Sequence, residues 1–158
     1  MSNSPGPGGS PGFLLWRTTL RWQRSITGAL RPLELTHVQF VLLASVWWLS
    51  DHADAGQRPS QRQAAEHAEV DAMMTSQVLR ALEQCGLVAR AADATDARVK
   101  RLTVTATGRR VAEKAVTVVE AADTEFFSSV REPALLLDVL GQLAGQSNEL
   151  QAKRGGAS

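Results

Sequence analysis

One stretch, residues 60–104, constrains the fold more than any other part of the chain. It reads SQRQAAEHAEVDAMMTSQVLRALEQCGLVARAADATDARVKRLTV, which predicts two short helices followed by a charged β-hairpin. Ser60 with Gln63 three residues later matches a capping box, and Gly86 suits the position after a helix end. A polar-faced helix beside a basic hairpin can enter one DNA groove and grip the next. We therefore expect a helix-turn-helix that carries a β-wing.

Helical patterns flank this stretch on both sides. We expect one helix over residues 13–30, and a second, apolar nearly all round, from a Thr36 cap to about residue 50. A long helix should run from Thr105 to about residue 130, and Pro133 suits the first turn of a last one. The predicted fold is mainly α with a small β-wing (α+β), a winged helix-turn-helix between long terminal helices. A short extra strand around residues 57–59 remains open.

Length and composition favour one cytoplasmic domain. The chain has 158 residues and 44% hydrophobic residues, enough for a core without disulfide or metal staples. No apolar run approaches the ~20 residues of a membrane span, and the uncharged Gly/Pro/Ser-rich start does not resemble a signal peptide. A single cysteine fits a reducing compartment. We expect a disordered tail at residues 1–12, one domain over 13–150 and a flexible tail at 151–158.

The charge is unevenly distributed although the net charge is only +1. Residues 58–110 hold nine Lys and Arg against six Asp and Glu, whereas residues 111–158 hold four against seven. Attraction to phosphate depends on local surface charge, so the low total does not exclude DNA binding. The basic excess lies in the stretch that predicts the DNA reader.

Two groups of polar residues are candidates for DNA contact. On the second short helix Val78, Leu79 and Leu82 form the inward stripe, which should leave polar neighbours outward to reach phosphates or base edges. In the hairpin, Asp96 can orient Arg98 into a minor groove. The alternatives are a solvated surface helix, and charges that prevent edge pairing. The candidates are Ser60, Gln61, Arg62, Thr75, Ser76, Gln77, Arg80, Arg90, Asp96, Arg98, Lys100 and Arg101.

Nearly the whole chain, from Phe13 to about Leu150, resembles the MarR family of bacterial transcriptional regulators. The most specific matches are LExxGLVxR at residues 82–90, DxR at 96–98 and VTxxG at 104–108, where most relatives have LTxxG. The resemblance implies an obligate homodimer, with dimerisation helices in 13–35 and 107–150 around a DNA-binding region at 36–106. It also implies a recognition helix at 73–84 in the major groove and Arg98 in the minor groove. Such a dimer calls for a pseudopalindromic site.

Members of this family often bind small aromatic or phenolic effectors, which makes aromatic and adaptable side chains candidate ligand contacts. These candidates are Trp16, Trp22, His37, Trp47, Trp48, His67 and Met73. The alternative for each is packing in the core or the dimer interface. We expect Cys85 to be inert packing, and three scattered histidines with one cysteine give no metal-ligand spacing. No cofactor is expected.

Enzyme motifs are missing from the sequence: it has no Gly-rich phosphate loop, nucleophile elbow or His-Glu metal motif. The expected function is that of a homodimeric repressor that binds double-stranded DNA at a pseudopalindromic operator and is released by a small effector. An effector-insensitive DNA-binding protein and a winged-helix protein-interaction module remain as alternatives, because fold does not dictate function.

Overall fold

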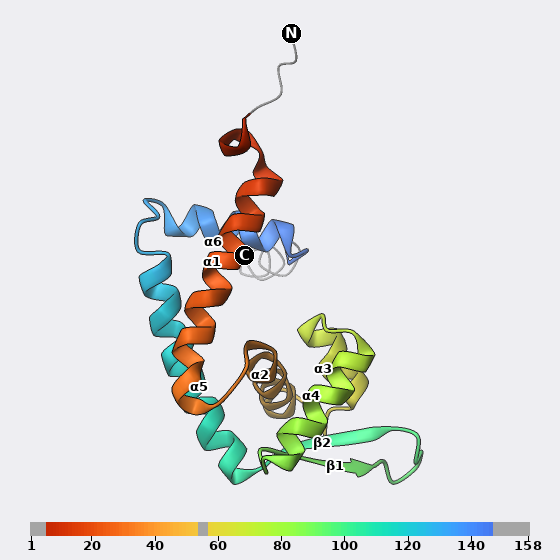
Figure 1. The fold of residues 1–158 in the computed structure, drawn as a ribbon. Helices are drawn as coiled ribbons and strands as arrows, with labels where there is room; N and C mark the ends of the chain where they lie inside the picture. The colour runs from red at the N-terminus through yellow and green to blue at the C-terminus, as the bar shows by residue number, and fades with distance from the viewer. Residues whose placement is uncertain (1–5, 54–56, 147–158) are drawn as a thin grey trace, which may run out of the picture. The chain divides into compact units, whose positions relative to one another are not determined.

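The computed structural model describes residues 6–53 and 57–146. The described chain is mostly helical with one two-stranded sheet, as predicted (Figure 1). Its elements are η1 (Pro7–Gly9), α1 (Pro11–Leu30), η2 (Arg31–Leu33), α2 (His37–Asp51), α3 (Gln61–Ala68), α4 (Ala72–Gln84), β1 (Val88–Ala92), β2 (Lys100–Val104), α5 (Ala106–Phe126) and α6 (Pro133–Leu143). The described residues up to Asp123 and those from Thr124 onward form two compact units, and the boundary falls in the last turn of α5.

Helix α1 starts two residues earlier than expected. The Ser10 hydroxyl accepts a hydrogen bond from the Phe13 backbone N–H at 3.3 Å, and Pro11 suits the first helical position. The segment expected to be a disordered tail, residues 1–12, therefore includes η1 and the first two residues of α1, while residues 1–5 lie outside the described part. Ile26 and Leu30 anchor the other end of α1 in the core.

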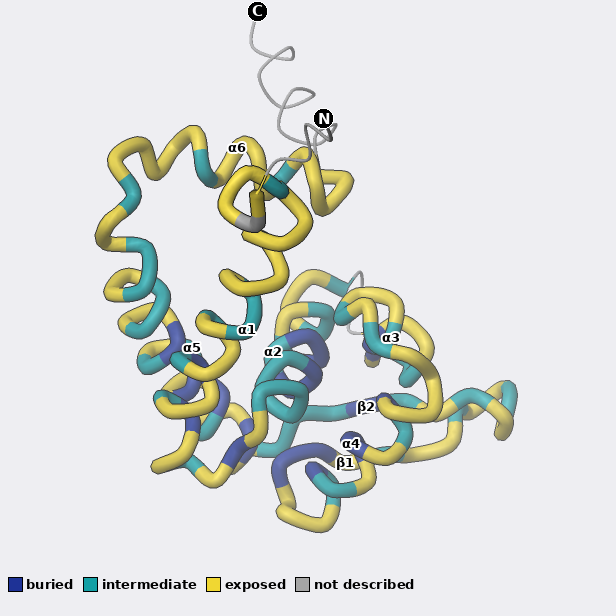
Figure 2. The backbone as a smooth tube through the Cα atoms, turned by 45° about the horizontal axis from the view of Figure 1, so that its top comes forward, coloured by how far each residue is buried: buried dark blue, intermediate teal, exposed yellow. Residues whose placement is uncertain are grey.

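Helix α2 lies at the centre of the first unit, as its all-round apolar pattern predicts. Leu42, Leu43 and Val46 are fully buried, and α2 shows as one of the darkest segments in Figure 2. Its start is fixed by a capping box: the Thr36 hydroxyl accepts from the Gln39 N–H, and the Gln39 side chain accepts from the Thr36 N–H. The local sequence thus sets where the core helix begins.

The helix-turn-helix is α3 followed by α4. Ser60 and Gln63 form the predicted capping box, with hydrogen bonds of 3.1 and 2.8 Å. Glu69 adopts a left-handed φ of 52° in the turn, and the Asp71 carboxylate caps α4 by accepting from the Met74 N–H at 2.9 Å. Gly86, with φ of 71°, follows the end of α4, a conformation that glycine adopts at little cost.

The wing is the antiparallel pair β1 and β2, with Val88 opposite Val104. The strand predicted near residues 57–59 is a single bridge between Ser60 and Arg101, supported by a 2.9 Å bond from the Leu102 N–H to the Pro59 carbonyl. Strand β2 is two residues shorter than the expected 98–104, because it begins at Lys100, whereas β1 has the expected five residues but lies one position later than the expected 87–91.

The VTxxG stretch joins the wing to α5. The Thr105 hydroxyl donates to the Gly86 carbonyl at 2.6 Å and accepts from the Gly108 N–H at 2.9 Å, so it caps α5 and ties it to the end of α4. A Cβ at Gly108 would overlap the Leu87 carbonyl. Only glycine therefore fits this helix position without a backbone shift.

The second unit contains the end of α5 and α6. The long helix ends at Phe126, four residues before the predicted end, and α6 begins at Pro133 as expected. No residue of α6 is buried, and its large exposed side chains are Leu135, Leu137, Val139, Leu140 and Leu143. Among the described helices none alone has the length and apolarity to cross a membrane; α1 with η2 and α2 pass that test only together, across a 76° bend. The tail expected at 151–158 lies outside the described residues.

Candidate nucleic-acid interface

Helix α4 presents one face to the core and the opposite face to solvent. At 3.6 residues per turn, Met73, Gln77, Arg80 and Gln84 share a stripe, and all four are exposed. The opposite stripe is buried and consists of Thr75, Val78, Leu79 and Leu82. The outward stripe has the length and residue types of a DNA-reading helix face.

Thr75 was predicted to face outward, and this is wrong. Its side chain is fully buried, and its hydroxyl donates to the Val70 carbonyl at 3.4 Å across the α3–α4 turn. The helical period already places Thr75 on the stripe of Val78 and Leu79, a signal that its polar residue type obscured. Thr75 therefore fixes the turn and is not available to DNA. Ser76 is half-buried beside the wing, and Gln77 and Arg80 are exposed as predicted.

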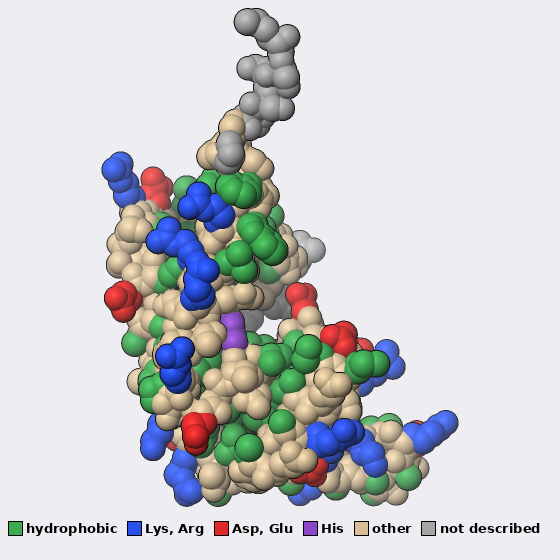
Figure 3. All heavy atoms as spheres, in the orientation of Figure 1, with side chains coloured by type: hydrophobic (Ala, Val, Ile, Leu, Met, Phe, Trp, Pro, Cys, Tyr) green, Lys and Arg blue, Asp and Glu red, His purple; other side chains and the backbone are tan. Residues whose placement is uncertain are grey.

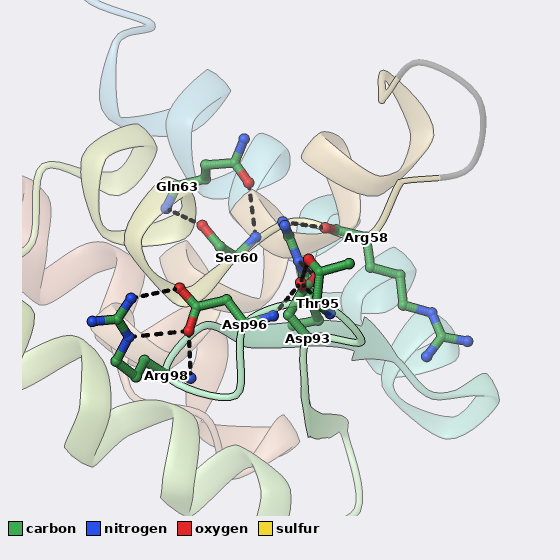
Figure 4. A network of polar contacts seen from close by, with 8 residues as sticks. Arg58, Ser60, Gln63, Asp93, Thr95, Asp96 and Arg98 are labelled. Carbon is green, nitrogen blue, oxygen red and sulfur yellow. Dashed lines mark hydrogen bonds and ion pairs between the residues drawn. The ribbon is translucent and has the colours of Figure 1, made fainter.

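The wing tip holds Arg98 in a defined direction (Figure 4). One Asp96 oxygen accepts from the Arg98 backbone N–H and Nε, both at 3.1 Å, and the other accepts from Nη2 at 3.2 Å. These bonds from Arg98 hold the pKa of Asp96 below its usual value, so the carboxylate is charged at neutral pH. The Arg98 side chain is nevertheless 91% exposed. An exposed, pre-oriented guanidinium suits insertion into a narrow minor groove.

Asp93 fastens the loop of the wing to β2. Its carboxylate accepts from the Thr95 N–H and hydroxyl, from the Asp96 N–H, and from Arg101 Nε at 2.7 Å. The Thr95 hydroxyl first, then Arg101, holds the pKa of Asp93 far below its usual range. Arg101 also donates to the Arg58 carbonyl at 3.1 Å. Arg101, a predicted DNA contact, thus serves first to tie the wing to the segment before α3.

Arg90 has a similar structural task. Its Nε and Nη2 donate to one Glu83 oxygen at 2.9 and 2.8 Å, linking β1 to α4, and its side chain is mostly buried. The Arg90 hydrogen bond lowers the pKa of Glu83. Lys100, by contrast, is exposed and has no ion pair within residues 6–53 and 57–146. The exposed cations of the wing are therefore Arg98 and Lys100.

The start of α3 completes the surface. The Ser60 hydroxyl is engaged in its cap, and Arg62, almost fully exposed, pairs with Glu66 at 2.8 Å. The Gln61 side-chain oxygen is buried and has no hydrogen-bond partner among the described residues. These three candidates thus differ: Arg62 is exposed, whereas the Ser60 hydroxyl is occupied in its cap and the Gln61 side chain is partly buried.

Candidates from α3, α4 and the wing line two hollows on one surface. One of about 830 Å³ separates α3 and the start of α4 from the wing tip, and includes Gln61, Arg62, Arg98 and Lys100 in its lining. Another of about 490 Å³ lies between α4 and the wing, and is lined in part by Ser76, Arg80, Arg90 and Lys100. Figure 3 shows Lys and Arg side chains over the wing at the lower right. A convex helix face flanked by hollows and cations has the form of a DNA-groove reader.

The predicted ligand candidates do not form one site. Trp22 meets His37 edge to face at 5.0 Å, and its Nε1 donates to Asp123 at 2.7 Å. His37 lines a hollow of about 470 Å³ between α1, α2 and the end of α3, and burial lowers its pKa, although nearby Asp123 opposes this. Trp16 on α1, 62% exposed, and Met73 on α4 lie away from this hollow.

The other aromatic candidates occupy two separate places. Trp48 stacks on His67 at 5.0 Å and on His52 at 4.2 Å, a histidine that the sequence did not single out. His67 Nδ1 shares a 3.0 Å hydrogen bond with the Ser45 hydroxyl. Trp47 lies under the Arg109 guanidinium, 5.4 Å from the ring centre. The aromatic candidates are therefore divided among separate places, and of them only His37 lines the hollow beside α1, with Trp22 packed against it.

Cys85 was expected to pack inside the protein, and this is wrong. It is the residue that follows α4, and it is exposed. Within the described residues no group of three or more His, Cys, Asp or Glu could hold a metal ion.

Comparisons with known proteins agree with this geometry. A family model for the ArnR1-like winged-helix domain matches residues 33–122. YdcH, an HTH-type transcriptional regulator of Bacillus subtilis, is 37% identical over 142 residues, which cover 90% of this chain and 95% of YdcH. The HTH-type transcriptional repressor Rv2887 of Mycobacterium tuberculosis is 36% identical over 124 residues, covering 77% of this chain and 83% of Rv2887.

Solved structures share the fold. CouR from Rhodococcus jostii, bound to p-coumaroyl-CoA, superposes with a TM-score of 0.75 at 26% identity, covering 89% of this chain and 96% of CouR. The MarR family protein Rv2887, in complex with salicylic acid, gives 0.64 at 33% identity, covering 85% and 96%.

Fold and interface together define a winged helix-turn-helix regulator that binds DNA. Its relatives are transcriptional regulators rather than enzymes, which confirms the prediction that the chain is not an enzyme. The chain belongs to the MarR family of transcriptional regulators.

Proposed function

We propose that the protein is a homodimeric repressor that binds a pseudopalindromic operator and is released by a small aromatic acid. The observation that carries the proposal is the pairing of the outward α4 face with the exposed Arg98 of the wing. One such reader covers only a half-site, so tight and selective binding calls for two readers related by a two-fold axis. One of the relatives, Rv2887, is a repressor, which supports repression rather than activation.

Exposed apolar side chains support the dimer. The start of α1 exposes Phe13, Leu14, Leu15 and Trp16, and α6 exposes five large aliphatic residues (Figure 3 shows the green side chains on α1). An exposed apolar face of this kind, on either helix, marks an interaction site in a monomer. A second copy of the chain would bury these surfaces in an isologous interface.

The hollow beside His37 supports the effector. At about 470 Å³ it has room for a one-ring ligand. Its lining includes the polar residues Gln23, Thr27 and Thr36 and the apolar residues Val38 and Val41. Two relatives bind compounds that contain an aromatic ring: Rv2887 with salicylic acid and CouR with p-coumaroyl-CoA. An effector held between α1, α2 and α3 would change the spacing of the two readers, and by linkage DNA would weaken effector binding equally. Because its target is the chromosome, the protein would act in the cytoplasm.

The test combines footprinting with stoichiometry on DNA from upstream of the protein's own reading frame. We expect two chains per site, two protected half-sites about 10 base pairs apart, and dissociation when salicylate is added as the probe effector. Leu137→Glu, on the exposed face of α6, should yield monomers that bind this DNA far more weakly. Arg131→Glu is the control, since it changes the charge of the same unit without touching an apolar face. One chain per site would overturn the proposal that the protein binds as a dimer. DNA binding that does not change with salicylate or other aromatic acids would overturn the proposed effector class.

A further inference from the structure

The outward stripe of α4 contains one apolar residue among polar ones. Gln77, Arg80 and Gln84 are the types expected on a DNA-reading face, whereas Met73 is an unbranched apolar side chain. It is 74% exposed, the most exposed large hydrophobic residue in the described chain. Met73 is also the second residue of α4, in the first turn, where a recognition helix places the side chains that meet base edges.

Met73 has no visible role in the fold. The hydrophobic core does not include it, nor do the side chains packed against that core. It lines neither of the two hollows beside the wing, nor the hollow beside His37. The helix start is capped by Asp71 through the Met74 backbone and does not need the Met73 side chain. The ligand role predicted from sequence is also unsupported, since the other candidates lie elsewhere.

We propose that Met73 reads the C5-methyl group of a thymine in the major groove. Among the base edges in that groove, the thymine methyl is the one apolar group, and a methionine thioether is flexible enough to cover it. The inference rests on the assignment of α4 as the recognition helix. Met73 and Gln77 are separated by about 6 Å along the helix axis. The thymine should therefore lie about two base pairs from the base that Gln77 meets, at steps of about 3.4 Å.

The test replaces each thymine of a tight binding site by uracil, which lacks only the methyl group. At one position in each half-site, replacing thymine by uracil should weaken binding by the wild-type protein about fourfold, the effect of one buried methylene-sized group. Met73→Ala should bind the thymine site more weakly and lose the preference for thymine over uracil at that position. Met73→Leu, which keeps an apolar side chain, should retain the preference.

Met74→Ala is the matched control. Met74 is the next residue and is 43% exposed, but it lies to one side of the outward stripe. This variant should discriminate thymine from uracil as the wild type does. Equal discrimination by Met73→Ala, or no position at which the wild type prefers thymine, would overturn the methyl contact while leaving selective DNA binding in place. Failure of the wild type to select any DNA sequence would instead overturn the recognition-helix assignment and the proposed function with it.

Discussion

Arg98 and Arg101 lie three residues apart in the wing, yet the structure gives them different tasks. Arg98 is held at the tip by Asp96 and projects into solvent. Arg101 is enclosed by Asp93 and the Arg58 carbonyl, and its exposed fraction is 24%. Residue type alone cannot separate the two roles, because the difference lies in partners that the folded wing brings together. At the residue scale, Arg98 is the better mutational probe of DNA binding.

The Asp93 carboxylate predicts an acid-sensitive wing. Its pKa is lowered in the folded protein, so its contribution to stability is fully present above its ordinary pKa of about 4 and is lost as the pH falls below that value. Asp93→Asn should be less stable than the wild type at pH 7, and should lose less stability between pH 7 and pH 3. Denaturant unfolding at both pH values measures this.

Thr95→Val provides a graded comparison, because it removes the hydroxyl that lowers the Asp93 pKa most and leaves Arg101 in place. Its pH dependence should fall between those of the wild type and Asp93→Asn. Parallel pH profiles for all three proteins would contradict the role of Asp93.

At the scale of elements, the junction between the wing and α5 depends on Gly108. Because a Cβ there would overlap the Leu87 backbone, Gly108→Ala should cost about 1–3 kcal/mol of unfolding free energy, as overpacking does. Gly28→Ala is the matched control: Gly28 lies within α1 with open space around it, so alanine should stabilise the protein by about 0.5–1 kcal/mol. Thermal or denaturant unfolding distinguishes the two, and similar stabilities for both variants would show that the backbone contact is unimportant.

Elements fixed by neighbours in sequence could be predicted, and elements fixed by distant partners could not. The Thr36 cap, the Ser60 capping box and the glycine after α4 are local signals, and all three are confirmed. The bond from Trp22 to Asp123 spans 101 residues, and that from Arg101 to Arg58 spans 43, so no sequence window contains either pair. Thr75 is a different case, since the helical period did place it inside and its residue type misled the interpretation.

At the scale of the whole molecule, the account rests on the outward α4 face and the wing acting together on DNA. In this proposal the α4 stripe would supply base contacts, and Arg98 and Lys100 would supply positive charge. The Arg101–Asp93 pair holds the wing loop against β2, and the Arg90–Glu83 pair links β1 to α4. The proposed dimerisation and effector release would act through this interface, since each would change the separation of two such surfaces. The interface is therefore the part of the account to test first.

The most direct test measures DNA affinity across a salt series for the wild type, Arg98→Ala and Arg110→Ala. Arg98→Ala should stay folded, lose about 1–3 kcal/mol of binding free energy, and show a log–log salt slope that is shallower by about 1 for each wing. Arg110, an exposed arginine on α5 that donates to Thr107, lies outside the interface, and its replacement should leave affinity close to that of the wild type. A variant without Arg98 that binds the operator as tightly as the wild type at every salt concentration would contradict the account.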